Sequence, residues 1–147
     1  MEYSAIFHEQ GLGKTKIAID PDTSKSGVAI FQEGKISYYA LSFFDLQDKI
    51  NDLADAELYI EAGWLNHPKN FRYSGPVAKI SNEVSARVGA NHQIGKLIEE
   101  FAKKKGMSYH LVKPLKKNWK GQNGKITSAE LNRLLTAKGY EPLKRSN

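Results

Sequence analysis

Two carboxylates each stand where a short apolar run ends. Asp20 follows the run 17–19, and Glu61 follows the run 58–60. If these runs are neighbouring parallel strands, both acids project from the same end of a sheet, where α/β sheets place their ligands. Two converging carboxylates repel each other unless a cation lies between them, and oxygen ligands select Mg²⁺ or Mn²⁺. Such a pair is the minimal core of a phosphodiester hydrolase, in which one ion activates water and a second stabilises the leaving oxygen.

Other potential ligands are less informative. Either acid taken alone could be a solvated turn residue, and Asp22 is better explained as a turn former than as an outer ligand. The four histidines, at positions 8, 67, 92 and 110, are scattered and show no metal-ligand spacing. The chain has no cysteine, which excludes a disulfide scaffold and any cysteine-ligated metal.

A lysine-rich segment provides a second candidate site. Residues 113–125 contain five lysines, one tryptophan and no acid. Because lysines at this density repel one another, they favour an anionic surface opposite, and phosphate contacts of this kind are salt-sensitive. Trp119 could stack on an unpaired base or be buried under the loop, and the lysines could simply form a solvated face. The candidate nucleic-acid-binding residues are Lys113, Lys116, Lys117, Trp119, Lys120 and Lys125.

Length and composition limit the kind of domain that can hold these candidate sites. The chain has 147 residues, 40% of them hydrophobic, which suits one domain with one core. Lys and Arg number 22 against 16 Asp and Glu, and the net charge of +6 favours a polyanion as partner. No apolar run approaches the ~20 residues of a membrane span, and the first residues lack the layout of a secretory signal. We therefore expect no membrane association and a cytoplasmic location.

Strands and helices alternate in a simple order. Apolar runs predict strands at 17–19, 28–31, 36–43, 58–60 and 109–112. Helical spacing predicts helices over 46–53 and 76–104, and a last helix that Thr127 or Ser128 opens and Gly139 ends. A three-strand meander followed by β-α-β crossovers implies a mixed five-stranded sheet with helices on its faces. Gly89 and Gly95 interrupt the long helix, each at a cost of about 1 kcal/mol, which a partner helix in close approach or a local kink would explain.

The amino terminus contains a phosphate-loop-like segment. Residues 10–15, Gln-Gly-Leu-Gly-Lys-Thr, resemble the phosphate loop of helicase-type ATPases. A phosphate loop needs a helix after its Lys-Thr, here Lys14 and Thr15, but the following residues predict a strand. We therefore treat residues 1–13 as an extension and residues 14–147 as the domain, with a nucleotide-binding fragment as an alternative.

Four segments in order resemble RuvC-like Holliday-junction resolvases, which have the ribonuclease H-like fold. The matching segments are Ile17–Pro21 with Ser26–Ala29, Tyr59–Glu61, the long helix from Ala86 to Lys105, and Val112–Pro114 with Trp119–Gly121 and Ser128–Leu135. The similarity covers about residues 14–140. It implies a homodimeric, Mg²⁺-dependent endonuclease that cuts branched DNA, with Asp20 and Glu61 as metal ligands, Lys116 near the scissile phosphate and a four-way junction as partner. It also implies a bacterium or a phage-infected cell as the host.

One departure from the family pattern matters. The family completes its site with one or two further acids on a last helix, and this sequence has no counterpart to them. Glu130 is the acid of the last predicted helix, and it corresponds to the preceding helix of the family. A non-catalytic module that binds branched DNA through the same fold is therefore the main alternative to a nuclease.

Overall fold

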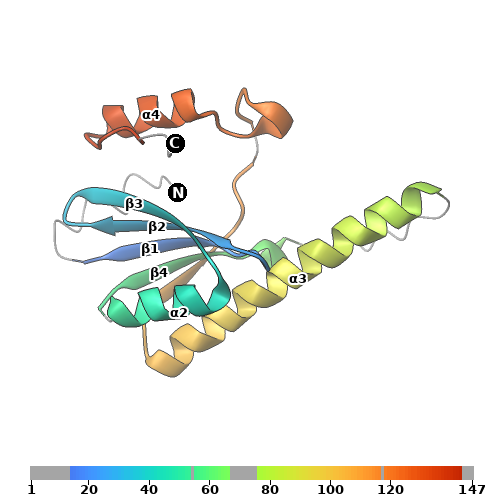
Figure 1. Ribbon diagram of the computed structural model, residues 1–147, viewed down its shortest axis with the longest axis horizontal. Helices are drawn as coiled ribbons and strands as arrows, with labels where there is room; N and C mark the ends of the chain where they lie inside the picture. Colours follow the sequence, from blue (N-terminus) through green and yellow to red (C-terminus); the bar gives the residue numbers. More distant parts are fainter. Residues whose placement is uncertain (1–13, 54, 67–75, 117, 144–147) are drawn as a thin grey trace.

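The computed structural model describes residues 14–53, 55–66, 76–116 and 118–143. Five strands form one mixed sheet in the order β3-β2-β1-β4-β5 (Figure 1). The strands are β1 (Lys16–Asp20), β2 (Ser26–Gln32), β3 (Lys35–Leu41), β4 (Glu57–Glu61) and β5 (Tyr109–Val112). The first three are antiparallel, whereas β4 runs parallel to β1 and β5 parallel to β4. This order confirms the predicted α/β class and its ribonuclease H-like sheet.

The β2–β3 hairpin and the end of β3 show how local chemistry sets the boundaries. Glu33 and Gly34 both adopt positive φ angles, 51° and 75°, which is the geometry of a tight hairpin turn. The sequence predicted a strand that reaches residue 43. This boundary was wrong, because β3 stops at Leu41. Ser42 instead caps helix α2 (Phe43–Asp52), and its hydroxyl accepts a hydrogen bond from the Asp45 N–H at 3.2 Å.

The core lies between the sheet and two helices. Strand residues of one alternating set, including Ile17, Ile19, Leu58 and Ile60, are almost fully buried. On this face they meet α2 and the carboxyl-terminal half of α3 (Pro76–Lys105), which contribute the buried residues Leu46, Ile50, Ile98 and Ala102. The core therefore lies on one face of β1 and β4. The alternate residues of these strands, which include Asp20 and Glu61, lie on the opposite face.

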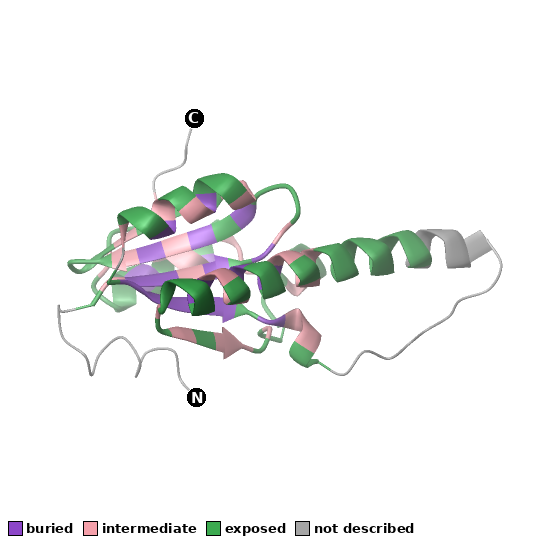
Figure 2. Cartoon of the chain, turned by 90° about the horizontal axis from the view of Figure 1, so that it is seen from below, coloured by how far each residue is buried: buried purple, intermediate pink, exposed green. Residues whose placement is uncertain are grey.

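Helix α3 runs unbroken through both of its glycines, as predicted. Its carboxyl-terminal half packs on the sheet, while its amino-terminal half projects beyond it (Figure 2). Residues 82–90 are all exposed. Gly106 follows the helix with a φ of 66°, the left-handed conformation expected at a helix end.

Helix α4 (Ser128–Ala137) lies on the other side of the sheet from α2 and α3 (Figure 1). Phe31 of β2 meets Tyr140, just beyond α4, edge to face with ring centroids 6.4 Å apart. Two short 3-10 helices, Gly63–Leu65 (η2) and Gln122–Gly124 (η3), were not predicted. Among the described helices, none combines the length and apolar character needed to cross a membrane.

Candidate active site

The structure brings Asp20 and Glu61 together. In the parallel pair β1–β4, Ile19 is opposite Ile60, so the next residue of each strand is an acid at the same sheet end. Neighbouring strands lie about 4.8 Å apart, which places the two carboxylates within reach of one ion. Both side chains are exposed and line one hollow of about 340 Å³. The predicted convergence of these two acids is thus present in the structure.

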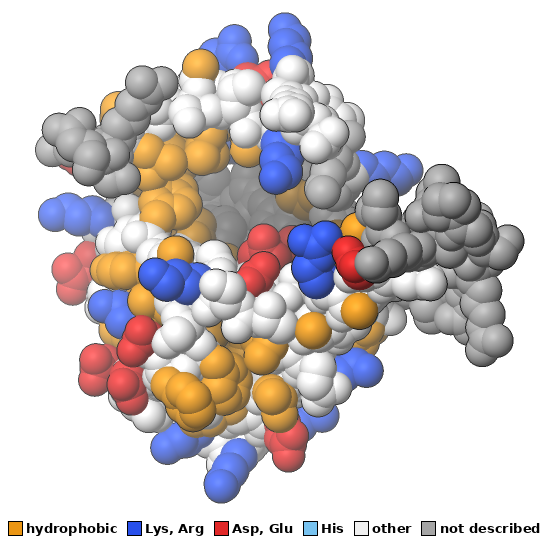
Figure 3. Space-filling model, turned by 45° about the vertical axis from the view of Figure 1, so that its right-hand side comes forward, with side chains coloured by type: hydrophobic (Ala, Val, Ile, Leu, Met, Phe, Trp, Pro, Cys, Tyr) orange, Lys and Arg blue, Asp and Glu red, His pale blue; other side chains and the backbone are white. Residues whose placement is uncertain are grey.

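Small residues create the hollow. Gly27 and Ala29 of β2 and Ala18 of β1 line it beside the acids, and Tyr38 and Tyr59 line it from the flanking strands. A Cβ at Gly27 would lie 3.7 Å from the Asp20 Cβ, so glycine leaves open the space next to that carboxylate. Figure 3 shows acidic side chains beside a recess in the surface, with lysine or arginine side chains close by.

The turn after β1 is tied to helix α3. The backbone N–H of Asp22 donates to the Ser26 hydroxyl at 3.1 Å, and the Ser24 N–H donates to the Asp22 carboxylate at 2.8 Å. Asn91 of α3 contacts the same turn, since its side-chain oxygen accepts from the Thr23 N–H at 3.0 Å. Asp22 therefore acts as a turn former, and these bonds hold the chain directly after Asp20.

The segment after Glu61 packs against the same helix. Trp64 of η2 lies edge to face with His92, with ring centroids 6.2 Å apart. A Cβ at Gly95 would overlap the Trp64 ring and would lie 3.1 Å from the Pro21 Cγ, whereas one at Gly89 would meet nothing within 4 Å. The close approach at Gly95 is thus made by the protein's own Trp64, and Asp20 and Glu61 are both followed by residues seated on α3.

A polar cluster extends from the hollow along the same sheet face. Glu57 is 8% exposed and accepts from the Tyr59 hydroxyl at 3.2 Å, and its second oxygen lies 2.7 Å from the His110 Nε2. The Tyr59 and His110 rings stack with centroids 4.7 Å apart. Burial and the neighbouring Glu57 carboxylate raise the pKa of Tyr59 to about 12, so Tyr59 stays a neutral hydrogen-bond donor. The cluster fixes the Tyr59 ring in one orientation.

This cluster predicts an acid-sensitive stability. Burial alone would raise the pKa of Glu57, but the hydrogen bond and charge of His110, with the Tyr59 hydroxyl, lower it overall. A carboxylate whose pKa is lower in the folded state stabilises the fold above its unfolded pKa and loses this contribution as pH falls through the folded value. We expect the free energy of unfolding of the wild type to fall between about pH 5 and about pH 3 more steeply than that of Glu57→Gln. Urea denaturation at a series of pH values measures this, and parallel curves would contradict it.

The lysine-rich segment 113–125, which we call the lysine loop, begins at the rim of the hollow. Val112 lines the hollow opposite Glu61, and Lys113 follows it directly. The side chains of Lys113, Lys116, Lys120 and Lys125 are exposed, and Trp119 is 40% exposed rather than buried under the loop. Lys117 lies outside the described residues. Lys116 is not among the residues that line the hollow, so its role near a phosphate stays a prediction.

Glu130 has a structural role. The Thr127 side chain accepts from the Glu130 N–H at 3.2 Å, and the Glu130 carboxylate accepts from the Thr127 N–H at 2.9 Å, which together make a capping box. Hydrogen bonds from the Thr127 and Lys120 backbones hold the pKa of Glu130 below its usual range. This carboxylate closes the start of α4 and anchors the lysine loop.

The donor set suits a magnesium ion that also binds substrate. Within the described part of the chain, no group of three or more His, Cys, Asp or Glu residues is placed to hold a metal. Mg²⁺ nevertheless is commonly held by one or two carboxylates together with waters and substrate phosphates. The oxygens of Asp20 and Glu61 fit that mode, and so does their place in an open hollow.

The phosphate-loop alternative lacks its structural context. Thr15 is followed directly by β1 and not by a helix, so the helix amino terminus that would face a phosphate is not found after Lys14 and Thr15. The rest of the predicted extension, residues 1–13, lies outside the described residues, as does His67.

The strand order, with its antiparallel and parallel pairings, defines an α/β fold with a ribonuclease H-like sheet. The chain is similar to a solved structure of T. thermophilus RuvC in complex with Holliday junction substrate, at 12% sequence identity and a TM-score of 0.43. The match covers 90% of this chain and 84% of that chain. No family model and no curated protein matches the sequence.

Sequence reasoning missed the tyrosines and the polar cluster. Their signal is a period of two: Ala18 and Asp20 in β1, and Glu57, Tyr59 and Glu61 in β4, alternate with buried apolar residues. Alternation of this kind assigns the non-apolar set to the opposite face of the sheet. This pattern could have identified a second face, although it would not have revealed the partners across the strands.

Proposed function

We propose that the chain is a metal-dependent endonuclease that acts on branched DNA, in particular on four-way junctions. The observation that carries this proposal is the pairing of Asp20 and Glu61 in one exposed hollow at the carboxyl ends of two parallel strands. Paired carboxylates of this kind bind the ions that support phosphodiester hydrolysis. The resemblance of the sequence to RuvC-like resolvases supports the same activity and the choice of DNA.

In this proposal, two carboxylates bind the metal ion and neighbouring residues hold them in position. Asp20 and Glu61 hold the ion, which when bound would polarise the phosphate and lower the pKa of water. The turn bonds of Asp22 with Ser26 and the packing of Trp64 on α3 keep the two acids in register. Because both acids are exposed, a DNA phosphate can supply the remaining oxygen ligands.

The lysine loop supplies the DNA contacts in this proposal. It leaves β5 beside Glu61, so a strand with a phosphate at the acids would pass the exposed Lys113 and Lys116. These contacts would hold the backbone and read the shape of the junction, since phosphate contacts carry little sequence information. Lys116 is the residue that we place nearest to the scissile phosphate.

A labelled four-way junction tests the function directly. We expect the purified chain to make paired nicks with Mg²⁺ or Mn²⁺ and none in EDTA, and to leave a duplex of the same sequence uncut. Binding in EDTA should weaken with salt, the logarithm of the affinity falling by about 0.9 per phosphate contact for each tenfold increase. Cleavage of duplex and junction at equal rates would contradict junction specificity.

The non-catalytic module stays the second candidate, because the described residues bring only two carboxylates together in the hollow. This candidate predicts a shifted junction on native gels and intact strands on denaturing gels, at every Mg²⁺ concentration. Absence of binding in both gels would exclude the nuclease and the module together.

The projecting half of α3 supports a homodimer in this proposal. Val84 and Val88 lie one helical turn apart and are each 45% exposed, although they continue the apolar stripe that packs on the sheet further along. A second copy that covers this stripe would present two sites to one junction. We expect light scattering to give twice the 16.5 kDa of one chain, and Val88→Glu to give a monomer. A wild-type monomer would contradict the dimer.

A further inference from the structure

One row of residues crosses the sheet directly behind the two acids. Cross-strand register places Tyr38 of β3 opposite Ala29, Ala29 opposite Ala18, and Ala18 opposite Tyr59. Directly paired residues point to the same face, so these four side chains share the face of Asp20 and Glu61. The row thus has an aromatic ring at each end and two methyl groups between them.

The dimensions of this row leave a slot. Four neighbouring strands span about 14 Å, and the two central ones bear only alanine here. All four residues line the hollow that contains the acids. Ala18 precedes Asp20 in β1 by two residues, and Tyr59 precedes Glu61 in β4 by two residues. The row therefore lies about 6.7 Å from the acids along the strands. One nucleotide unit can therefore connect a phosphate at the acids with a base at the row.

The aromatic rings at the two ends of the row differ in exposure and in contacts. Tyr59 is 9% exposed: its ring stacks on His110, Lys16 Nζ lies 5.9 Å from the ring centroid, and its hydroxyl donates to Glu57, so these contacts fix the ring. Tyr38 is 42% exposed and offers a ring to an incoming group. Two alanines between two aromatic rings suit a nucleobase. Every base has a flat face that can stack on an aromatic ring, so such binding does not depend on the DNA sequence.

We infer that this slot, formed by Tyr38, Ala29, Ala18 and Tyr59, binds the base of one unpaired nucleotide of the DNA strand whose phosphate lies at Asp20 and Glu61. The inference rests on the proposed function for the position of that phosphate. A base inside a continuous duplex is stacked on both sides and cannot enter the slot, whereas a base at a branch point can leave its stack. The slot therefore selects for locally unpaired DNA next to the cut.

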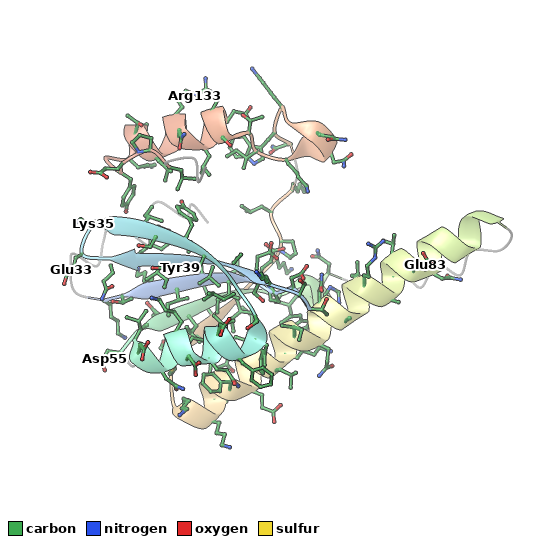
Figure 4. The ribbon with its side chains drawn as sticks, in the orientation of Figure 1. Glu33, Lys35, Tyr39, Asp55, Glu83 and Arg133 are labelled. Atoms are coloured by element: carbon green, nitrogen blue, oxygen red, sulfur yellow. The ribbon has the colours of Figure 1, made fainter. Side chains whose placement is uncertain are left out.

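Affinity measurements in EDTA test the slot without hydrolysis. Base–aromatic stacking contributes about 1–3 kcal/mol per base, so Tyr38→Ala should weaken binding of a four-way junction roughly 5- to 150-fold, while Tyr38→Phe retains the ring and the affinity. Phe44→Ala is the matched control, because Phe44 is 74% exposed, lies on α2 at the other side of the sheet and is not among the residues that line the hollow. Tyr39, the next residue of β3 (Figure 4), is unsuitable as a control because it also lines the hollow.

Modified DNA supplies a readout that does not depend on the folding of a variant. Junctions with an abasic site at each nucleotide around the crossover should include one position that weakens wild-type binding and leaves Tyr38→Ala binding unchanged. Overturning results are an abasic series with no effect on the wild type, or equal losses in both proteins. If Mg²⁺-dependent nicking occurs with no effect of Tyr38, the slot alone fails. If the Tyr38 and abasic effects occur without nicking, the slot stands and the nuclease proposal fails.

Discussion

Asp20→Asn and Glu61→Gln are each expected to reduce Mg²⁺-dependent cleavage of a four-way junction by at least ~100-fold. Loss of a group in the outer shell of a metal site commonly costs 10–100-fold, and these residues would be direct ligands. With two protein carboxylates at the site, removal of one leaves a single charge to hold a divalent ion. The measurement is the single-turnover rate of nicking at saturating protein.

Binding separates this prediction from a loss of folding. Both substitutions are nearly isosteric and remove a negative charge that faces the DNA phosphates, so affinity in EDTA should be unchanged or higher. Asp55→Asn is the matched control, because Asp55 lies in the turn before β4, at the opposite end of that strand from Glu61 (Figure 4). Wild-type cleavage rates in either site variant would show that this acid does not hold the ion.

Gly95→Ala is expected to destabilise the fold while Gly89→Ala stabilises it. Both glycines lie inside α3, so alanine raises helix propensity by up to about 1 kcal/mol at each. At Gly95 the new Cβ overlaps the Trp64 ring, and overpacking of this kind commonly costs 1–3 kcal/mol. The difference in unfolding free energy between the two variants should therefore be about 1–3 kcal/mol, measured by urea denaturation.

A second substitution identifies the cause of that loss. Trp64→Leu removes the ring atoms that the Gly95 Cβ would meet, so Gly95→Ala should cost less in the Trp64→Leu background than in the wild type. Additive effects would show that the strain does not arise from this contact. Because Trp64 follows Glu61 by three residues, we also expect Gly95→Ala to lower cleavage through a shift of that carboxylate.

Much of the fold was predictable from local patterns. Apolar runs located all five strands, and the structure then separated a core-facing set, such as Ile17 and Ile60, from the set that contains Asp20 and Glu61. The end of β3 was misplaced because Phe43 is apolar in either context. The cap at Ser42 and the packing of Phe43 against the core place it in a helix.

The sequence by itself determined the five strands, the start of the last helix at Thr127 or Ser128, and the position of each acid at the end of a strand. These features depend on residues within one or two turns of each other, so periodicity and capping residues reveal them. Only the tertiary structure decided that Trp64 occupies the space at Gly95 and that Tyr38 and Tyr59 enclose two alanines beside the acids. Such contacts depend on the register between strands that are distant in sequence, and a shift of one residue would reverse every face.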